Sequence, residues 1–204
     1  MLVLFLILLL AVIAFFKTDV KDKFIKPKYE DVIKSDIDYD SDGIDDYTDI
    51  LNGAKDFISK KPKYKSKYYD VGYPTDEYRV CTDIIWYALK NAGYDFKTLI
   101  DEDIKNNKDE YDEDVGDTNI DFRRVRNIKV YLDRNALKLA NDSDFNPGDI
   151  VVYKKHIAIV SDRVNSKNEN YILHQHMYQA YEYDGLFKNE ILGHYRWRLN
   201  DGKK

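Results

Sequence analysis

The chain opens on an uninterrupted apolar run, MLVLFLILLLAVIAFF (residues 1–16), which has no charged side chain and ends at Lys17. A run without a polar face is not typical of a core helix, and it predicts a signal-peptide core or a short membrane anchor. The tripeptide VIA at 12–14 offers a signal-peptidase site, so release is the alternative to anchoring. Residues 17–35 are rich in Lys and Asp with little periodicity, which predicts a tether.

Helical spacing dominates the chain from there to about residue 138. ILNGAKDFI, directly after an Asp-rich stretch at 36–49, predicts a short helix, and residues 60–78 are predicted to be irregular. From Cys81 to Ala92 apolar residues recur every three or four positions, and Gly93 stands where a helix would end. Two further short helices are predicted, at 97–105 and at about 125–138.

The pattern changes at the Asn-Pro-Gly turn of residues 146–148. Short β-branched and aromatic runs come next, separated by brief polar links, and these predict strands: DIVVY, HIAIVSD, NYILHQH, QAYEYD and ILGHYRWRL. Helices first and then an antiparallel meander predict an α+β fold.

The size and charge of the chain limit its architecture and partners. At 204 residues it holds one globular domain with a terminal attachment, and we expect a monomer. We divide the remainder into residues 36–62, a loop and short helix, and residues 63–200, the main domain. The 37 acidic and 32 basic residues give a net charge of −5 without a basic stripe, which argues against nucleic acid as a partner.

Cys81 is the single cysteine, so an intrachain disulfide is impossible. Its thiol is therefore either a buried structural side chain or a reactive group. It stands at the start of its predicted helix, where free N–H groups and the helix dipole favour a thiolate. A structural cysteine would more naturally lie mid-helix on the apolar stripe. The position therefore predicts a nucleophile with a lowered thiol pKa.

His156 opens the second predicted strand, directly after the Pro-Gly-Asp turn and the strand that continues from it. A histidine that begins a strand lies at the edge of the sheet and faces the element that packs against this edge. If the helix that begins near Cys81 packs there, an imidazole lies beside a thiol, as nucleophilic catalysis requires. A structural histidine is the alternative.

A cysteine at a helix start, a PGD turn into a strand and a histidine opening the next strand together resemble the NlpC-type cell-wall peptidases of the papain-like superfamily. More narrowly, several ordered blocks over about residues 63–198 resemble the bacterial domain of unknown function 1287 family: VCTDIIWYALKNAGY, TNIDFRRVRNIKVYLDRNA, PGDIVVYKKHIAIVSD, YILHQ and GHYRW. The resemblance implies a papain-like fold, with the nucleophile helix packed on a C-terminal antiparallel sheet. It also implies an exported cysteine hydrolase that cleaves an amide bond in peptidoglycan and needs no cofactor for catalysis.

The same resemblance places a third catalytic position on the strand YILHQH, and there it implies His174 as the residue that orients His156. The family tends to show His-Asn where this chain has His174-Gln175, so Gln175 remains an alternative. Arg123 and Arg124 lie in another matched block. They either hold a substrate carboxylate by bidentate hydrogen bonds or bridge loops to the acidic residues at 101–103.

The Asp-rich stretch carries a second motif, DYDSDGIDDYTD. Acidic residues at loop positions one, three, five, nine and twelve, with glycine at position six, match the calcium loop of an EF-hand. Asp at position twelve replaces the usual glutamate, so the motif is closer to the loops of extracellular repeats. The predicted calcium ligands are Asp38, Asp40, Asp42, the Ile44 carbonyl, Asp46 and Asp49. A merely solvated acidic loop is the alternative.

These features favour an exported, membrane-anchored or secreted cysteine hydrolase with a structural calcium ion. The lysines that come after residues 1–16 would by the positive-inside rule keep the domain in the cytoplasm, but the calcium-type loop and the resemblance favour export. Two other classes of function remain open. One is a wall-binding module without turnover, and the other is a calcium-dependent extracellular scaffold.

Overall fold

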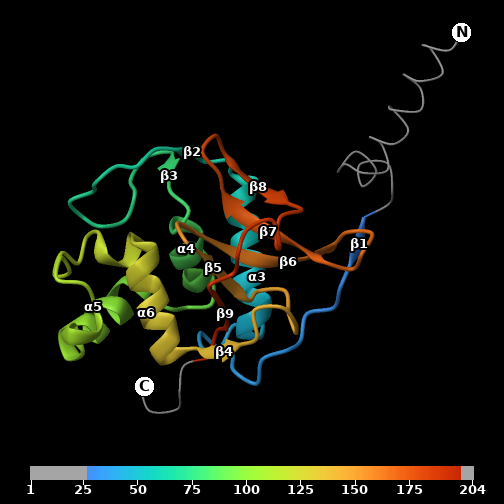
Figure 1. Ribbon diagram of the computed structural model, residues 1–204, viewed down its shortest axis with the longest axis horizontal. Coiled ribbons are helices and arrows are strands. Elements are labelled where there is room, and N and C mark those ends of the chain that lie inside the picture. Colours follow the sequence, from blue (N-terminus) through green and yellow to red (C-terminus); the bar gives the residue numbers. More distant parts are fainter. Residues whose placement is uncertain (1–26, 199–204) are drawn as a thin grey trace, which may run out of the picture.

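The computed structural model describes residues 27–198, and within them an α+β fold with helices in the first half packed on a C-terminal antiparallel sheet. α5 and α6 lie on one side of α4, and the sheet lies on the other (Figure 1). The helices are α3 (Asp46–Ser59), α4 (Asp83–Asn91), α5 (Phe96–Asn106) and α6 (Val125–Asn135), with two 3-10 turns, η1 (Lys108–Glu110) and η2 (Asp121–Arg123).

Seven strands in the described residues form the main sheet, in the order β4-β9-β5-β6-β7-β8, with β1 paired to β6. Their bounds are β1 (Lys28–Tyr29), β4 (Leu137–Leu139), β5 (Ile150–Tyr153), β6 (His156–Val164), β7 (Asn170–Gln175), β8 (Ala180–Tyr183) and β9 (Gly193–Arg196). A separate parallel pair joins β2 (Lys63–Tyr64) to β3 (Tyr78–Arg79), within the stretch predicted to be irregular.

The predicted helices and the five predicted strands are all present, and the largest differences lie at three helix ends. α3 begins at Asp46, inside the predicted calcium loop, because Asp45 caps it by accepting a hydrogen bond from the Thr48 amide. α4 begins at Asp83, so Cys81 lies in the turn before the helix. The helix predicted at 125–138 ends at Asn135, and the next residues form β4.

The predicted meander is wrong at its last strand. β9 does not lie next to β8 in the sheet but returns to lie between β4 and β5. The buried carboxylate of Asp149, just before β5, explains this return, because it binds two side chains of β9. Its oxygens accept from Arg196 Nε and Nη2, each at 2.8 Å, and face His194 Nε2 at 2.8 Å. A buried carboxylate needs such partners.

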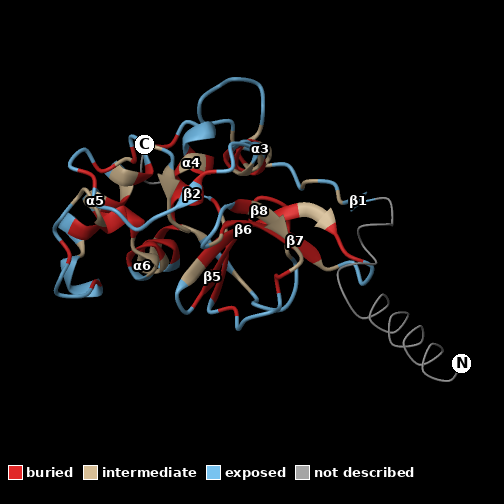
Figure 2. Ribbon diagram, turned by 90° about the horizontal axis from the view of Figure 1, so that it is seen from above, coloured by how far each residue is buried: buried red, intermediate tan, exposed pale blue. Residues whose placement is uncertain are grey.

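The two faces of the sheet carry separate apolar clusters, as strand alternation requires. On the helix side, Ile150, Val152, Ile157, Ile159 and Leu173 join the large core with α3 and α4. The opposite face forms a smaller cluster closed by a loop, made of Val151, Tyr153, Ala158, Val160, Ile172, Leu186 and Ile191. Figure 2 shows the buried residues concentrated in the strands and on the helix faces that meet them.

α3 and α4 approach each other closely at Gly53. A Cβ added at this glycine would lie 2.7 Å from the Asn91 Cβ and 2.9 Å from the Ala88 Cα. Part of that contact is backbone, which has little room to move. Gly53 therefore sets the distance between the long helix α3 and the helix next to Cys81.

The described end of the predicted tether is attached to the domain. Lys28 and Tyr29 form β1 against Val164 and Arg163, and the Ile33 amide donates to Asn146 Oδ1 at 2.8 Å. Residues 27–35 are therefore part of the domain, while the segments 1–16 and 17–26 lie outside the described residues. None of the helices within residues 27–198 is both long enough and apolar enough to cross a membrane.

Replacing Gly53 by Ala tests the close helix contact. Alanine favours a helix by about 1 kcal/mol over glycine, but overpacking costs about 1–3 kcal/mol, and here the clash includes backbone. We expect a net loss of unfolding free energy, measured by urea denaturation. Asn52→Ala, on the exposed side of the same helix, should leave stability unchanged or slightly higher. A stabilised Gly53→Ala would contradict the tight contact.

Candidate active site

Cys81 lies in a turn whose conformation is fixed by hydrogen bonds to buried polar side chains. The carboxylate of Asp83 accepts from the Val80 amide at 2.7 Å and from Trp86 Nε1 at 2.9 Å, so it closes the turn around the cysteine. The hydroxyl of Thr82, which is 1% exposed, donates to the Arg123 carbonyl at 3.0 Å. These contacts fix the position of the half-buried Cys81 relative to the core.

His156 and His174 form a direct imidazole pair. His156 begins β6, His174 lies on the neighbouring strand β7, and His156 Nε2 is 2.9 Å from His174 Nδ1. The two rings are nearly perpendicular, with centroids 5.1 Å apart. This arrangement leaves Nδ1 of His156 as the ring nitrogen that is available for another partner.

Cys81, His156 and His174 line one cavity of about 750 Å³. The backbone N–H of Ile157, the residue after His156, is hydrogen-bonded to the Cys81 sulfur. The structure thus brings together the three residues that the sequence analysis selected. The cavity is otherwise bordered by tyrosines, two lysines and other side chains, among them Tyr64, Tyr153, Tyr181, Tyr183, Lys154, Lys155, His176 and Glu190.

The expected low thiol pKa is wrong for this geometry. Burial raises the pKa of Cys81 to about 11, against the opposing effect of the Ile157 amide, and the carboxylate of Asp83 adds to the increase. Helix α4 starts two residues after Cys81 and carries Asp83 in its first turn, so a negative charge stands where the prediction assumed only N–H groups. Burial also lowers the pKa of His156 to about 4. The resting pair is therefore a neutral thiol and a neutral imidazole.

The alternatives for the third position differ clearly in their contacts. His174 touches His156, whereas the amide of Gln175 donates to the carbonyls of Pro62 at 3.2 Å and His176 at 3.0 Å. Gln175 therefore fastens β7 to the segment before β2, and of the two residues it is His174 that contacts the His156 ring. Burial, followed by the nearby His156 and His176, lowers the pKa of His174 to about 3.

The family model for a domain of unknown function, DUF1287, matches residues 51–197. The chain belongs to the DUF1287 family. It is also 32% identical over 164 residues to the uncharacterized protein YijF of Escherichia coli (strain K12), an alignment that covers 72% of this chain and 80% of that relative. No solved structure matches the chain. Cys81, His156 and His174 all lie within the residues matched to DUF1287.

Arg123 is engaged inside this DUF1287 domain and is not presented to a substrate. Its Nε and Nη2 donate to the two oxygens of Asp83 at 2.8 and 3.0 Å, and Nη1 donates to the Lys67 carbonyl at 2.9 Å. The side chains of the pair are 1% and 0% exposed. The arginine predicted as a substrate clamp instead neutralises the carboxylate beneath the Cys81 turn.

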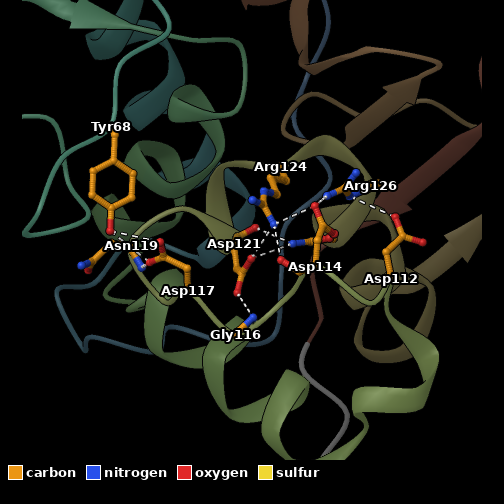
Figure 3. A network of polar contacts seen from close by, with 10 residues as sticks. Tyr68, Asp112, Asp114, Gly116, Asp117, Asn119, Asp121, Arg124 and Arg126 are labelled. Carbon is orange, nitrogen blue, oxygen red and sulfur yellow. Dashed lines mark hydrogen bonds and ion pairs between the residues drawn. The ribbon is translucent and has the colours of Figure 1, made fainter.

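Arg124 belongs to a surface network that Figure 3 shows. Its Nη1 donates to Asp121 Oδ1 at 3.1 Å and to the Asp114 carbonyl at 2.9 Å, and Arg126 also pairs with Asp114. These partners replace the acidic residues at 101–103 that we expected. Among the described residues, neither Arg123 nor Arg124 lines the cavity of Cys81.

The acidic loop before α3 lies outside that cavity, and its residues differ in their contacts. Asp38, Asp40 and Asp42 are exposed and close together. Asp46 is 2% exposed, and its oxygens accept from the Tyr39 amide at 2.9 Å and from the Tyr94 hydroxyl. Asp46 thus anchors the loop, a role that the ligand prediction did not foresee. The Ile44 carbonyl stays a predicted ligand.

The aromatic surroundings of the histidine pair were not foreseen. The ring of Tyr183 stacks on His174 with centroids 5.5 Å apart, and Tyr181 approaches edge-on at 4.8 Å. Both tyrosines come from β8, whose alternation places residues 181 and 183 on one face. The alternation of Tyr181 and Tyr183 is visible in the sequence, but only the pairing of β8 with β7 shows that these rings lie beside His174.

Breaking the buried ion pair should be costly. Asp83→Ala leaves the Arg123 guanidinium buried without its partner, and we expect a loss of about 3–5 kcal/mol of unfolding free energy, measured by urea denaturation. As a control, Lys105→Ala removes the exposed ion pair with Asp101 and should change the midpoint little. Similar effects of the two variants would contradict a structural role for Asp83–Arg123.

The histidine pair should make stability depend on pH. The folded pKa values of His156 and His174 lie below the usual 6.5, so the unfolded chain binds protons more readily. The free energy of unfolding should therefore fall as the pH drops from about 6.5 toward 4, and NMR titration should place both midpoints below pH 5. The double variant His156→Gln/His174→Gln should flatten this slope, and ordinary titration near 6.5 in the wild type would contradict the buried neutral pair.

Proposed function

We propose that this DUF1287 chain is an exported cysteine hydrolase that cleaves an amide bond in cell-wall peptide, with a papain-like arrangement of helix and sheet. The observation that carries the proposal is the bond between His156 Nε2 and His174 Nδ1 in a cavity that Cys81 also lines. It leaves one nitrogen of His156 available for the thiol and assigns the other to an orienting residue. Nucleophile, base and orienter are the three parts that such chemistry needs.

The reaction begins from neutral groups. As the Cys81 sulfur bonds to the carbonyl carbon, its proton passes to Nδ1 of His156, and the carbonyl electrons move onto oxygen. Collapse of this intermediate breaks the C–N bond, and the leaving amine takes the proton from His156. The product is a thioester. Water, deprotonated by His156, then releases the acid and restores the thiol.

His174 supports the base through its lone pair. For Nδ1 of His156 to accept a proton, Nε2 must carry the other hydrogen and donate it to His174 Nδ1 at 2.9 Å. That bond strengthens when His156 becomes charged. The tyrosines packed on the His174 ring keep it in place, so the pair is oriented before substrate arrives.

Several groups around the cavity suit a peptide that carries carboxylates. Lys154 and Lys155 are exposed on the turn between β5 and β6, directly before His156. Their ammonium groups can bind a carboxylate without the buried Arg123. The backbone N–H groups of Cys81 and Thr82, which point to the sulfur, are placed to hold an oxyanion as it forms there.

A non-catalytic wall-binding module is the second candidate, and the protonated state of Cys81 favours it. A pKa near 11 keeps the thiol protonated at neutral pH, and a pure binder has no need of a thiolate. The two candidates differ in turnover, because a binder uses the cavity without breaking a bond. They also differ in the effect of removing the Cys81 sulfur alone, which should abolish the function of a hydrolase but not that of a binding module.

Digestion of purified peptidoglycan, with mass spectrometry of the released fragments, separates these functions. We expect new fragments from the wild type and none from Cys81→Ala. His156→Ala should lose about 10²–10⁴-fold in rate because the general base is gone, while His174→Gln, which retains a hydrogen-bond acceptor, should lose less.

Lys105→Ala serves as the matched control for this digestion, since Lys105 is exposed on α5 and does not line the cavity. It should digest like the wild type, and unfolding midpoints of all variants should confirm that they fold. If the wild-type protein binds peptidoglycan without releasing fragments, the hydrolase proposal is rejected and the binding module remains.

A further inference from the structure

Three carboxylates converge on the loop before α3, the segment that leads from β1 to the base of that helix (Figure 1). Asp38, Asp40 and Asp42 each offer an oxygen atom, and these atoms lie within 4.8 Å of one another. Asp38 is held in place by the amides of Asp42 and Gly43, at 3.1 and 2.9 Å. Like charges at this distance repel, so a cation between them would remove an electrostatic cost.

Asp49, in the first turn of α3, supplies a second and independent observation that points to a cation. It is 2% exposed, and its Oδ2 is buried without a hydrogen-bond partner among the described residues, while Oδ1 faces Asn91 Nδ2 at 3.4 Å. Asp49 contacts Asn91, and Asp40 lies against Gly93, so both carboxylates are at the same end of α4. A buried unpaired carboxylate is rarely tolerated without a positive partner.

The same loop is fastened to the far end of the helix next to Cys81. Asn91, the last residue of α4, donates from Nδ2 to the Asp49 carbonyl at 3.0 Å. The ring of Tyr39 stacks on Tyr94 with centroids 4.2 Å apart, and a Cβ added at Gly93 would meet the Asp40 Cβ at 2.7 Å. A ligand that orders this loop would therefore also support the C-terminal end of α4.

We propose that residues 38–49 form a calcium site that braces the C-terminal end of α4, with Asp38, Asp40, Asp42 and Asp49 as its carboxylate ligands. Gly43, at φ +94°, makes the sharp turn that folds the loop back on itself. Several carboxylates on one loop suit Ca²⁺, whereas Mg²⁺ demands a compact octahedron and keeps its waters. The site does not depend on the proposed hydrolase, because its residues lie outside the cavity of Cys81.

Terbium luminescence and thermal unfolding of the purified full-length chain test this site. Tb³⁺ replaces Ca²⁺ at oxygen sites, and Tyr39 within the loop should sensitise its emission. Ca²⁺ should displace Tb³⁺ with a midpoint of about 10⁻⁴–10⁻³ M, the range of extracellular calcium modules, and Mg²⁺ should require a higher concentration. Calcium should also raise the Tm, because the ion binds the folded state.

Asp40→Ala is the decisive variant, since Asp40 is exposed and its loss should not disturb folding in the absence of calcium. It should weaken calcium binding by about tenfold or more and remove the rise in Tm. Asp36→Asn, an exposed acidic residue two positions before the loop, is the matched control and should behave like the wild type.

Hydrogen exchange measures the brace directly. Calcium should increase the protection of amides at the end of α4 in the wild type and not in Asp40→Ala. Absence of a calcium response in the wild type, an equal response to Mg²⁺, or an unchanged response in Asp40→Ala would overturn the site. Protection confined to the loop would overturn the brace. None of these outcomes bears on peptidoglycan digestion, so the two proposals can fail separately.

Discussion

The buried pair of Asp83 and Arg123 is the contact on which the arrangement around Cys81 depends. One carboxylate at the start of α4 binds a guanidinium from η2, the amide before Cys81 and the indole of Trp86. The arginine in turn reaches the Lys67 carbonyl in the long irregular segment. The two charged groups are buried together, and the removal of either would leave the other buried without a partner. The pair therefore holds three chain segments in one arrangement.

A second buried carboxylate organises the sheet in the same way. Asp149 accepts from the Asn146 amide at 2.7 Å and from the β9 side chains of His194 and Arg196. It thereby fixes β5 in the centre of the sheet, with β6 and His156 on one side and β9 on the other. Both carboxylates lie close to catalytic candidates in the sequence, but each acts by positioning backbone.

The low polarity around the histidine pair shapes the chemistry that we propose. Burial disfavours charge on Cys81 and on both imidazoles, so charge develops only when substrate is present. His156 is unprotonated over a wide pH range and can therefore accept a proton as the sulfur attacks, and His174 is positioned to stabilise the imidazolium that forms. A thiolate at rest is therefore not a requirement for this site.

The sequence by itself determined the α+β order, the main helices and strands, and the selection of Cys81, His156 and His174 as candidates, which the structure places around one cavity. Periodicity, turn residues and local motifs depend on neighbouring positions, so the sequence shows them directly. Only the tertiary structure decided the return of β9 beside β5, the burial of Arg123 against Asp83 and the partners of Asp46. It also reversed the expected direction of the thiol pKa. Each of these depends on groups far apart along the chain, and burial, which controls pKa and the pairing of buried charges, exists only once the distant segments have packed together.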